Sequence, residues 1–281
     1  DYLRDEVGRR LLDRTDDILP RAGGRFEQGL DLGSALSGEL LQTLAKHTRL
    51  PPIQVAQAEA ALLRDARPGD GVRRIVGSEE RLLDLGVAEQ SADLVVSNLA
   101  LHWVNDLPGT LVQANLALRP DGVLLASMFG GETLRELRDS FAVAEQERDG
   151  GLSPHVSPFA GVSDIGNVLS RAQLQLPTVD TEEITVRFSS AWTLMRELGR
   201  MGEANAVLLR RRHTPRATLL AAAAFYQHYF GLPDGSVPAT FQVIYMIGWA
   251  PHQDQPKPKR RGSAQYHLGD LPAVLAEPPA K

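Results

Sequence analysis

The sequence contains no cysteine, no long apolar run and no excess of basic residues. Without cysteine the chain has no disulfide, no thiolate nucleophile and no cysteine-ligated metal, which fits a reducing compartment. The longest apolar run, residues 219–225, is far shorter than the ~20 residues that a transmembrane helix needs, and we interpret it as part of a buried helix. The formal charge of -5 argues against a general nucleic-acid-binding protein, because neutralising phosphates requires a basic surface.

The composition is that of an ordinary globular chain. With 281 residues, of which 43% are hydrophobic and 23% charged, the chain is large enough for one sizeable α/β domain with additions or for two small domains. It begins at Asp1 inside a segment with helical spacing, so we expect any targeting peptide to have been left out or removed.

The remaining pattern is organised around residues 93–128. The apolar run 94–96, followed by Ser97 and Asn98, predicts a central parallel strand buried on both faces. A helix over 107–118, a Pro-Asp-Gly turn and a strand over 123–128 complete a βαβ unit. In open α/β sheets ligands bind beyond the carboxyl ends of the strands. Four side chains fill that position here: Asn98, His102, Trp103 and Asp106.

Alternating strand and helix patterns elsewhere predict a mainly parallel sheet with helices on both faces. We expect the strand at 178–186 to lie at an edge and the last strand, 241–249, to be antiparallel. The further predicted strands cover 53–55 and 72–76, and the predicted helices cover 2–14, 164–171, 192–201 and 214–229. A long helix also follows the glycines at 130–131, and residues 150–159 form an irregular loop because they contain two prolines and two glycines.

Four runs resemble a known family: LHWVNDLPG at 101–109, PDGVLLASMFGGETLRELR at 120–138, GGLSPHVSPF at 150–159 and GSVPATFQVIYMIGW at 235–249. The chain resembles, over nearly its whole length, the methyltransferase-like mitochondrial complex I assembly factors described as arginine hydroxylases. The resemblance implies a class I S-adenosylmethionine methyltransferase fold with seven strands. It also implies a location on the matrix side of the mitochondrial inner membrane, and action on the complex I iron–sulfur subunit nearest the quinone site.

The first strand-to-helix turn, which holds the cofactor in such folds, departs from the family pattern DLGCGxG. Asp31 and Gly33 are present, but Ser34, Ala35 and Leu36 follow, and Gly38 comes later. A β-carbon at the second glycine position would occupy space that the ligand uses. We interpret the segment as an ordinary strand, cap and helix, so the turn is a degenerate cofactor loop.

Two more cofactor positions of the family differ. After the second strand the resemblance implies an acidic residue for the ribose hydroxyls, but Ala56 and Gln57 stand there, and Glu59 is only a partial candidate. After the third strand the aspartate that would recognise adenine is replaced by Ser78, next to Glu79 and Glu80. We therefore expect no bound cofactor, or S-adenosylmethionine only if the pocket still functions.

The partner side of the family pattern is retained. We expect Asn98, His102, Trp103, Asp106 and His155 to face substrate or partner, with 150–160 as a lid loop inserted in a single domain over 1–250. The domain would carry added helices over 191–229, and 251–281 would be a proline-rich basic tail free to lie on a partner. We expect no metal site, although His102 and Asp106 offer two of the three groups of a facial iron triad.

Three functions remain open. The first is a methyltransferase-like protein of mitochondrial complex I that acts by binding, as an assembly factor or a retained accessory subunit, with a degenerate cofactor pocket. The second is an active S-adenosylmethionine-dependent arginine hydroxylase or methyltransferase acting on the iron–sulfur subunit. The third is a small-molecule methyltransferase similar to the malonyl-carrier-protein enzymes.

Overall fold

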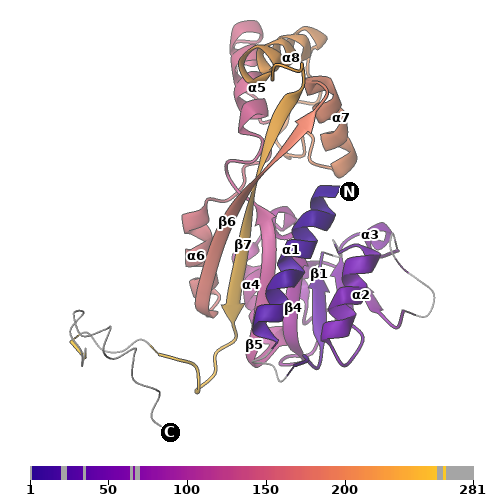
Figure 1. Ribbon diagram of the computed structural model, residues 1–281, viewed down its shortest axis with the longest axis vertical. Coiled ribbons are helices and arrows are strands. Elements are labelled where there is room, and N and C mark those ends of the chain that lie inside the picture. Colours follow the sequence, from indigo (N-terminus) through magenta and orange to yellow (C-terminus); the bar gives the residue numbers. More distant parts are fainter. Residues whose placement is uncertain are drawn as a thin grey trace. The chain divides into compact units, whose positions relative to one another are not determined.

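The computed structural model describes residues 2–19, 24–33, 36–63, 66, 70–257 and 262–263. Its strands form one seven-stranded sheet in the order β3-β2-β1-β4-β5-β7-β6 (Figure 1). The strands are β1 (Gly29–Leu32), β2 (Ile53–Ala56), β3 (Arg73–Val76), β4 (Ala92–Asn98), β5 (Leu118–Phe129), β6 (Gln175–Phe188) and β7 (Val237–Trp249). The helices are α1 (Tyr2–Ile18), α2 (Gly38–His47), α3 (Glu59–Leu63), α4 (Leu107–Ala117), α5 (Arg135–Arg148), α6 (Val162–Arg171), α7 (Ala191–Met201) and α8 (Arg216–Phe230), with 3-10 turns η1 (Glu79–Arg81) and η2 (Leu101–Trp103).

The sheet confirms the fold predicted from the sequence. Strand β4 lies between β1 and β5 and is parallel to both, and its side chains at Val95 and Val96 are fully buried. A strand covered on both faces needs an unbroken apolar run, which is what residues 94–96 supply. The last strand, β7, is antiparallel to both β5 and β6, and β6 forms the edge of the sheet.

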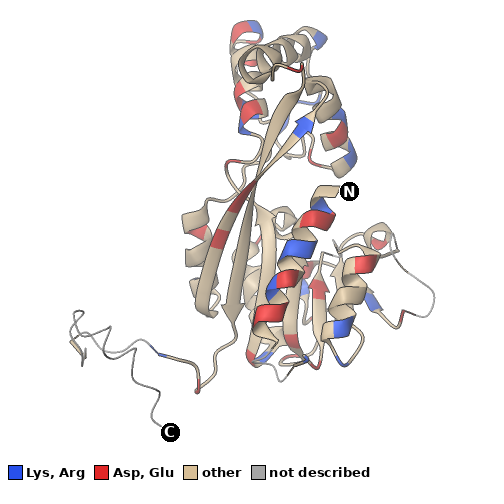
Figure 2. Ribbon diagram, viewed as in Figure 1, with Lys and Arg blue, Asp and Glu red and all other residues tan. Residues whose placement is uncertain are grey.

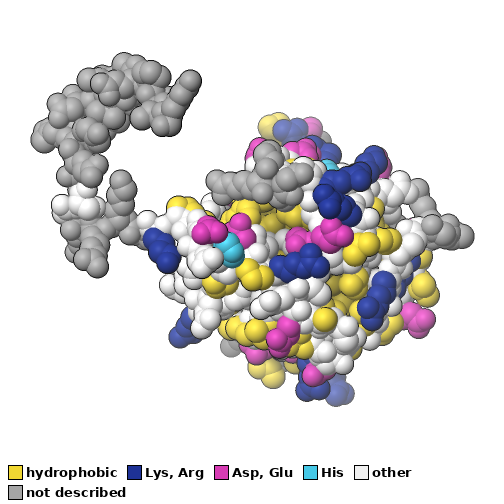
Figure 3. All heavy atoms as spheres, turned by 90° about the horizontal axis from the view of Figure 1, so that it is seen from below, with side chains coloured by type: hydrophobic (Ala, Val, Ile, Leu, Met, Phe, Trp, Pro, Cys, Tyr) yellow, Lys and Arg dark blue, Asp and Glu magenta, His cyan; other side chains and the backbone are white. Residues whose placement is uncertain are grey.

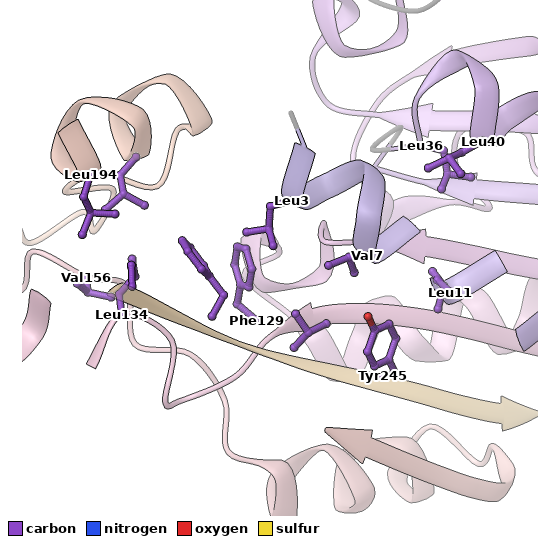
Figure 4. Close-up of a cluster of buried hydrophobic side chains, with 14 of the residues drawn as sticks. Leu3, Val7, Leu11, Leu36, Leu40, Phe129, Leu134, Val156, Leu194 and Tyr245 are labelled. Atoms are coloured by element: carbon purple, nitrogen blue, oxygen red, sulfur yellow. The ribbon is translucent and has the colours of Figure 1, made fainter. Parts of the chain in front are cut away.

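Helices cover both faces of the sheet. On one face α1 and α2 share a core with β4, β5 and β7, and on the other α4 and α6 cover the same strands. Helix α1 buries Leu3, Val7 and Leu11 toward the strands, as Figure 4 shows, and it runs four residues beyond the predicted end at residue 14. Its outward side carries alternating acidic and basic residues (Figure 2). Amphipathic packing of this kind explains why the helix forms.

Tyr245 of β7 lies under α1. The Arg14 guanidinium is 4.0 Å from the centre of its ring. Burial raises the pKa of the Tyr245 hydroxyl to about 12, with the charge of Glu182 adding to this and that of Arg14 opposing it. The tyrosine is therefore neutral at physiological pH and serves as an apolar contact between helix and sheet.

Strands β6 and β7 continue beyond the rest of the sheet. Strand β5 pairs only with the part of β7 from Val243 onward, whereas residues 237–242 pair with β6 alone. Helices α5, α7 and α8 contact β6 or β7, and α8 also contacts both α5 and α7. Tyr226 of α8 is fully buried there, and its hydroxyl donates to the Pro238 carbonyl at 2.7 Å. The extension thus supports a helical layer next to the carboxyl end of β4.

The chain divides into one compact unit, Asp1–Pro251, and a second unit, His252–Lys281. Most of the predicted basic tail, including Lys259, Arg260 and Arg261, lies outside the described residues. None of the helices in the described part of the chain is long and apolar enough to cross a membrane. On the face of the molecule shown in Figure 3, acidic and basic side chains are interspersed, so that face is not a uniformly basic surface.

Candidate functional site

The candidate site begins at Asn98, the last residue of β4, whose side chain is fully buried. Its amide nitrogen donates to the Arg4 carbonyl at 3.0 Å, and its oxygen accepts a hydrogen bond from the Ser127 hydroxyl at 2.9 Å. These bonds join α1 and β5 to the end of β4. Asn98 therefore stabilises the elements around the site, and its side chain does not reach the surface of the site.

The turn η2 separates three consecutive side chains. Leu101 and the imidazole of His102 are buried, whereas Trp103 is 45% exposed. A 3-10 turn has three residues per turn, so successive side chains point in different directions. The indole of Trp103 is therefore not part of the hydrophobic core, and it lies at the surface next to the buried His102.

His102 forms a buried pair with Glu203, which follows α7. Its Nε2 atom lies 3.0 Å from Glu203 Oε1, and its ring packs against Phe129 at 4.9 Å between ring centres. The second atom of each group, His102 Nδ1 and Glu203 Oε2, is buried without a hydrogen-bond partner in the described chain. Such an atom costs about 1–3 kcal/mol unless something else satisfies it. A ligand group that supplies hydrogen-bond donors would do so.

Glu203 and Trp103 line a small cavity of about 120 Å³. Its other lining residues are Leu3, Arg4, Leu99, Phe129 and Met201. A carboxylate beside aromatic faces is suited to a cationic side chain, because charge-assisted hydrogen bonds and the ring quadrupoles act together. The sequence offered no indication of Glu203, since 101 residues separate it from His102.

Asp106 is exposed and caps α4. Its carboxylate accepts a hydrogen bond from the Gly109 amide at 2.9 Å. Glu80 supports the same turn by accepting from the amides of Asn105 and Asp106, at 2.6 and 3.2 Å. Among the described residues no group of three or more His, Cys, Asp or Glu side chains is placed to hold a metal ion. Asp106 and Glu80 therefore hold the start of α4, which lies a few residues after Trp103.

His155 lies in a different cluster. It is 9% exposed, stacks on Phe141 at 3.9 Å between ring centres, and places Nε2 2.8 Å from Glu145 Oε1. The other oxygen of Glu145 accepts from the Ser153 amide at 2.6 Å. The histidine also lines a cavity of about 460 Å³, to which Phe159 contributes. The loop expected to act as a lid is thus fastened to α5 through Glu145.

The expected cofactor side lies at the ends of β1, β2 and β3. Asp31 is fully buried and accepts a hydrogen bond from the side-chain amide of Gln54 at 2.8 Å. Gly33 has a φ of +90°, and Gly38 is the first residue of α2. Ser34 and Ala35, which depart from the family pattern, lie outside the described residues. Asp31 and Gly33 therefore have structural roles within the chain itself.

At the end of β2 the methyl group of Ala56 takes the place of the expected acid. The exposed Gln57 donates from its amide to Glu79 at 2.9 Å, and Glu59 is exposed at the start of α3. Ser78 caps η1 by accepting from the Glu80 amide at 3.3 Å. A methyl group cannot accept hydrogen bonds from ribose hydroxyls. At this position the described residues therefore lack the acidic acceptor that the family pattern has for the ribose.

Gly33 is explained by packing against the chain itself. A β-carbon there would lie 2.1 Å from the Ala100 β-carbon, and the positive φ disfavours any other residue. We expect Gly33→Ala to lower the free energy of unfolding by about 2–5 kcal/mol, from backbone strain and overpacking together. Urea denaturation measures this.

The matched control is Gly166→Ala, in α6, where an added β-carbon meets nothing within 4 Å. We expect that change to raise stability by up to about 1 kcal/mol, because alanine favours a helix. Equal stability of Gly33→Ala and the unaltered protein would contradict the packing explanation.

Comparisons with known proteins agree with this fold. A family profile described as "Methyltransferase domain" matches residues 30–126, from the second residue of β1 to Ala126 of β5. The crystal structure of the YcgJ protein from Bacillus subtilis superposes with a TM-score of 0.54 at 14% identity, covering 87% of this chain and 99% of that one. At this identity the likeness shows the fold alone. The fold is the class I methyltransferase fold.

Curated relatives are similar over nearly the whole chain. The protein named arginine-hydroxylase NDUFAF5, mitochondrial, is 46% identical in Homo sapiens over 96% of this chain and 76% of the relative. Its Dictyostelium discoideum counterpart is 45% identical over 96% of this chain, and the chain spans 65% of that relative's length. A malonyl-[acyl-carrier protein] O-methyltransferase from Xylella fastidiosa is 35% identical over 89% of this chain and 81% of the relative.

Proposed function

Because the chain belongs to the family of the mitochondrial arginine-hydroxylase NDUFAF5, we propose that it acts in mitochondria by binding a subunit of respiratory complex I. It serves there as an assembly factor or a retained accessory subunit, on the matrix side of the inner membrane. The partner is the iron–sulfur subunit near the quinone site. The class I methyltransferase fold supplies the framework for this interaction.

The observation that carries the proposal is the half-exposed Trp103 beside the unsatisfied carboxylate oxygen of Glu203. A guanidinium from the partner would donate hydrogen bonds to that oxygen and stack on the indole. The relatives are named for arginine, which is consistent with such a side chain. Trp103, Asp106 and Glu203 would contact or orient the partner, while Asn98, His102 and His155 hold the surface in place.

We propose that this binding does not depend on S-adenosylmethionine. Losing one hydrogen bond to a charged group costs about 1.5–3 kcal/mol of ligand affinity, and the acid at the end of β2 is missing. The amide of Gln57 is already engaged by Glu79. Together with the altered turn after Gly33, these differences would reduce cofactor affinity by several powers of ten.

Two alternatives remain. An active S-adenosylmethionine-dependent enzyme acting on an arginine is favoured by the name of the relatives and by the matched methyltransferase region. A small-molecule methyltransferase is favoured by the similarity to the malonyl-carrier-protein enzyme. The added helices favour the hypothesis of a protein partner, because Glu203, which completes the site, follows α7 directly.

Affinity capture of the tagged chain from detergent-solubilised mitochondria, followed by mass spectrometry, tests the proposal. We expect complex I subunits to be retained. Retention of mature complex I at equal stoichiometry would identify an accessory subunit, and retention of early intermediates alone would identify an assembly factor. Absence of complex I subunits, together with methyl transfer to a small acyl substrate, would refute the proposal in favour of the third function.

A further inference from the structure

The segment between α7 and α8 presents two adjacent leucines to solvent. Leu208 and Leu209 are 88% and 90% exposed, the highest values among the large hydrophobic side chains of the described chain. Isolated surface leucines are common, but two neighbours that project almost completely are not explained by packing within the chain. They indicate a surface that something else covers.

The charges around these leucines are positive. Between Asn205 and Arg216 the sequence has four arginines and no acidic residue. Arg211 is paired with Asp149 at 2.5 Å. Among the residues that the structure describes, no carboxylate lies within 4.0 Å of Arg210 or Arg212. Two of the three arginines that follow the leucines, Arg210 and Arg212, therefore have no acidic partner in the described part of the chain.

Backbone hydrogen bonds hold the segment on both sides of its exposed tip, Leu208 and Leu209. The Asn205 amide donates to the His155 carbonyl at 3.1 Å, and the Arg211 amide donates to the Ser153 hydroxyl at 3.2 Å. Next to Ser153, Leu152 is 70% exposed and adds a third apolar side chain. The backbone bonds thus fix where the apolar tip and its arginines stand.

We propose that Leu208 and Leu209 insert into the interfacial region of an anionic lipid bilayer, with Arg210 and Arg212 on the lipid phosphates. The inference deepens the proposed location at the inner membrane and rests on it. Apolar side chains flanked by basic residues bind at the boundary of headgroups and acyl chains, and arginines reach phosphates while their stems stay in apolar surroundings. Each basic residue near such a surface contributes on the order of five-fold in partitioning.

A lipid surface fits these observations better than a protein groove. Protein interfaces are enriched in aromatic side chains at their centre, whereas this tip consists of aliphatic side chains followed by arginines. The charge complementarity with anionic headgroups is direct, because no carboxylate of the described residues pairs with Arg210 or Arg212.

Co-sedimentation with vesicles tests the proposal on the full chain. The probes are phosphatidylcholine vesicles with and without phosphatidylglycerol. We expect binding to the mixed vesicles, an at least ten-fold loss for the double change Leu208→Ser and Leu209→Ser, and a comparable loss for Arg210→Gln with Arg212→Gln. Added salt should still weaken the residual vesicle binding of the leucine variant, but it should no longer weaken that of the arginine variant.

The control is Leu63→Ser, at a leucine of α3 that is 57% exposed and should leave vesicle binding unchanged. No binding of the unaltered chain to the mixed vesicles, or equal binding by the leucine double variant, would overturn the proposal. Capture of complex I subunits in detergent keeps the two proposals apart, since it needs no bilayer. If the leucine double variant no longer captured complex I subunits but still bound vesicles, Leu208 and Leu209 would bind a protein, which would also overturn the lipid proposal.

Discussion

Changing Trp103 to alanine is expected to weaken binding of the complex I partner by roughly 30-fold or more, equivalent to about 2 kcal/mol or more. The indole is 45% exposed and lines the cavity that contains Glu203. Removing it would take away both the aromatic face for a cation and the side chain that keeps water from the carboxylate. Quantitative mass spectrometry of affinity-captured partner measures the loss.

The control for this change is Trp192→Ala. Trp192 is 44% exposed, so the two substitutions remove the same side chain from nearly the same degree of exposure. Trp192 lies at the start of α7, nine positions before Met201, which is the residue of that helix that lines the cavity. We expect Trp192→Ala to retain the partner and both variants to unfold at similar temperatures. Equal partner loss in both variants would refute Trp103 as the anchor.

Changing Glu145 to alanine is expected to destabilise the protein by about 2–5 kcal/mol, because two buried hydrogen-bond donors lose their acceptor. Its carboxylate is 1% exposed and accepts from His155 Nε2 and the Ser153 amide. A guanidinium nitrogen of Arg211 lies 3.9 Å away. The alanine would leave these donors buried and unpaired, and it would release the loop at 150–159 from α5. Urea denaturation measures the change.

Glu147→Ala serves as the matched control on the same helix. Glu147 is exposed, so we expect its replacement to change stability by no more than about 0.5 kcal/mol. If Glu145→Ala were as stable as Glu147→Ala, the buried pair would not be what fastens the loop.

Local pattern was sufficient for most of the fold. The apolar run at 94–96 identified β4 as a central strand, because burial on both faces requires apolar residues throughout. Helix α1 was predicted because Leu3, Val7 and Leu11 recur at helical spacing. The paired extension of β6 and β7 past the end of β5 was not predicted, since pairing between distant strands leaves no periodic trace in either segment.

The candidate site was harder to predict from the sequence than the fold. The segment at 98–106 was located correctly at a strand end, but whether each side chain faces inward depends on contacts with distant elements. Asn98 is buried because α1 lies above it, and His102 is buried because Glu203 arrives from beyond α7. His155 similarly finds Glu145 on α5, ten residues earlier in the chain. Tertiary pairs of this kind cannot be inferred from one segment alone.

Calorimetric titration of the purified chain with S-adenosylmethionine tests most directly whether it acts by binding a partner without this cofactor. We predict no measurable binding, or a dissociation constant no tighter than millimolar. Glycines at Ala35 and Ser37 together with Ala56→Asp should then improve the affinity, because they return the expected turn and ribose acceptor. Micromolar binding by the unaltered chain would contradict the account and favour an active S-adenosylmethionine-dependent enzyme.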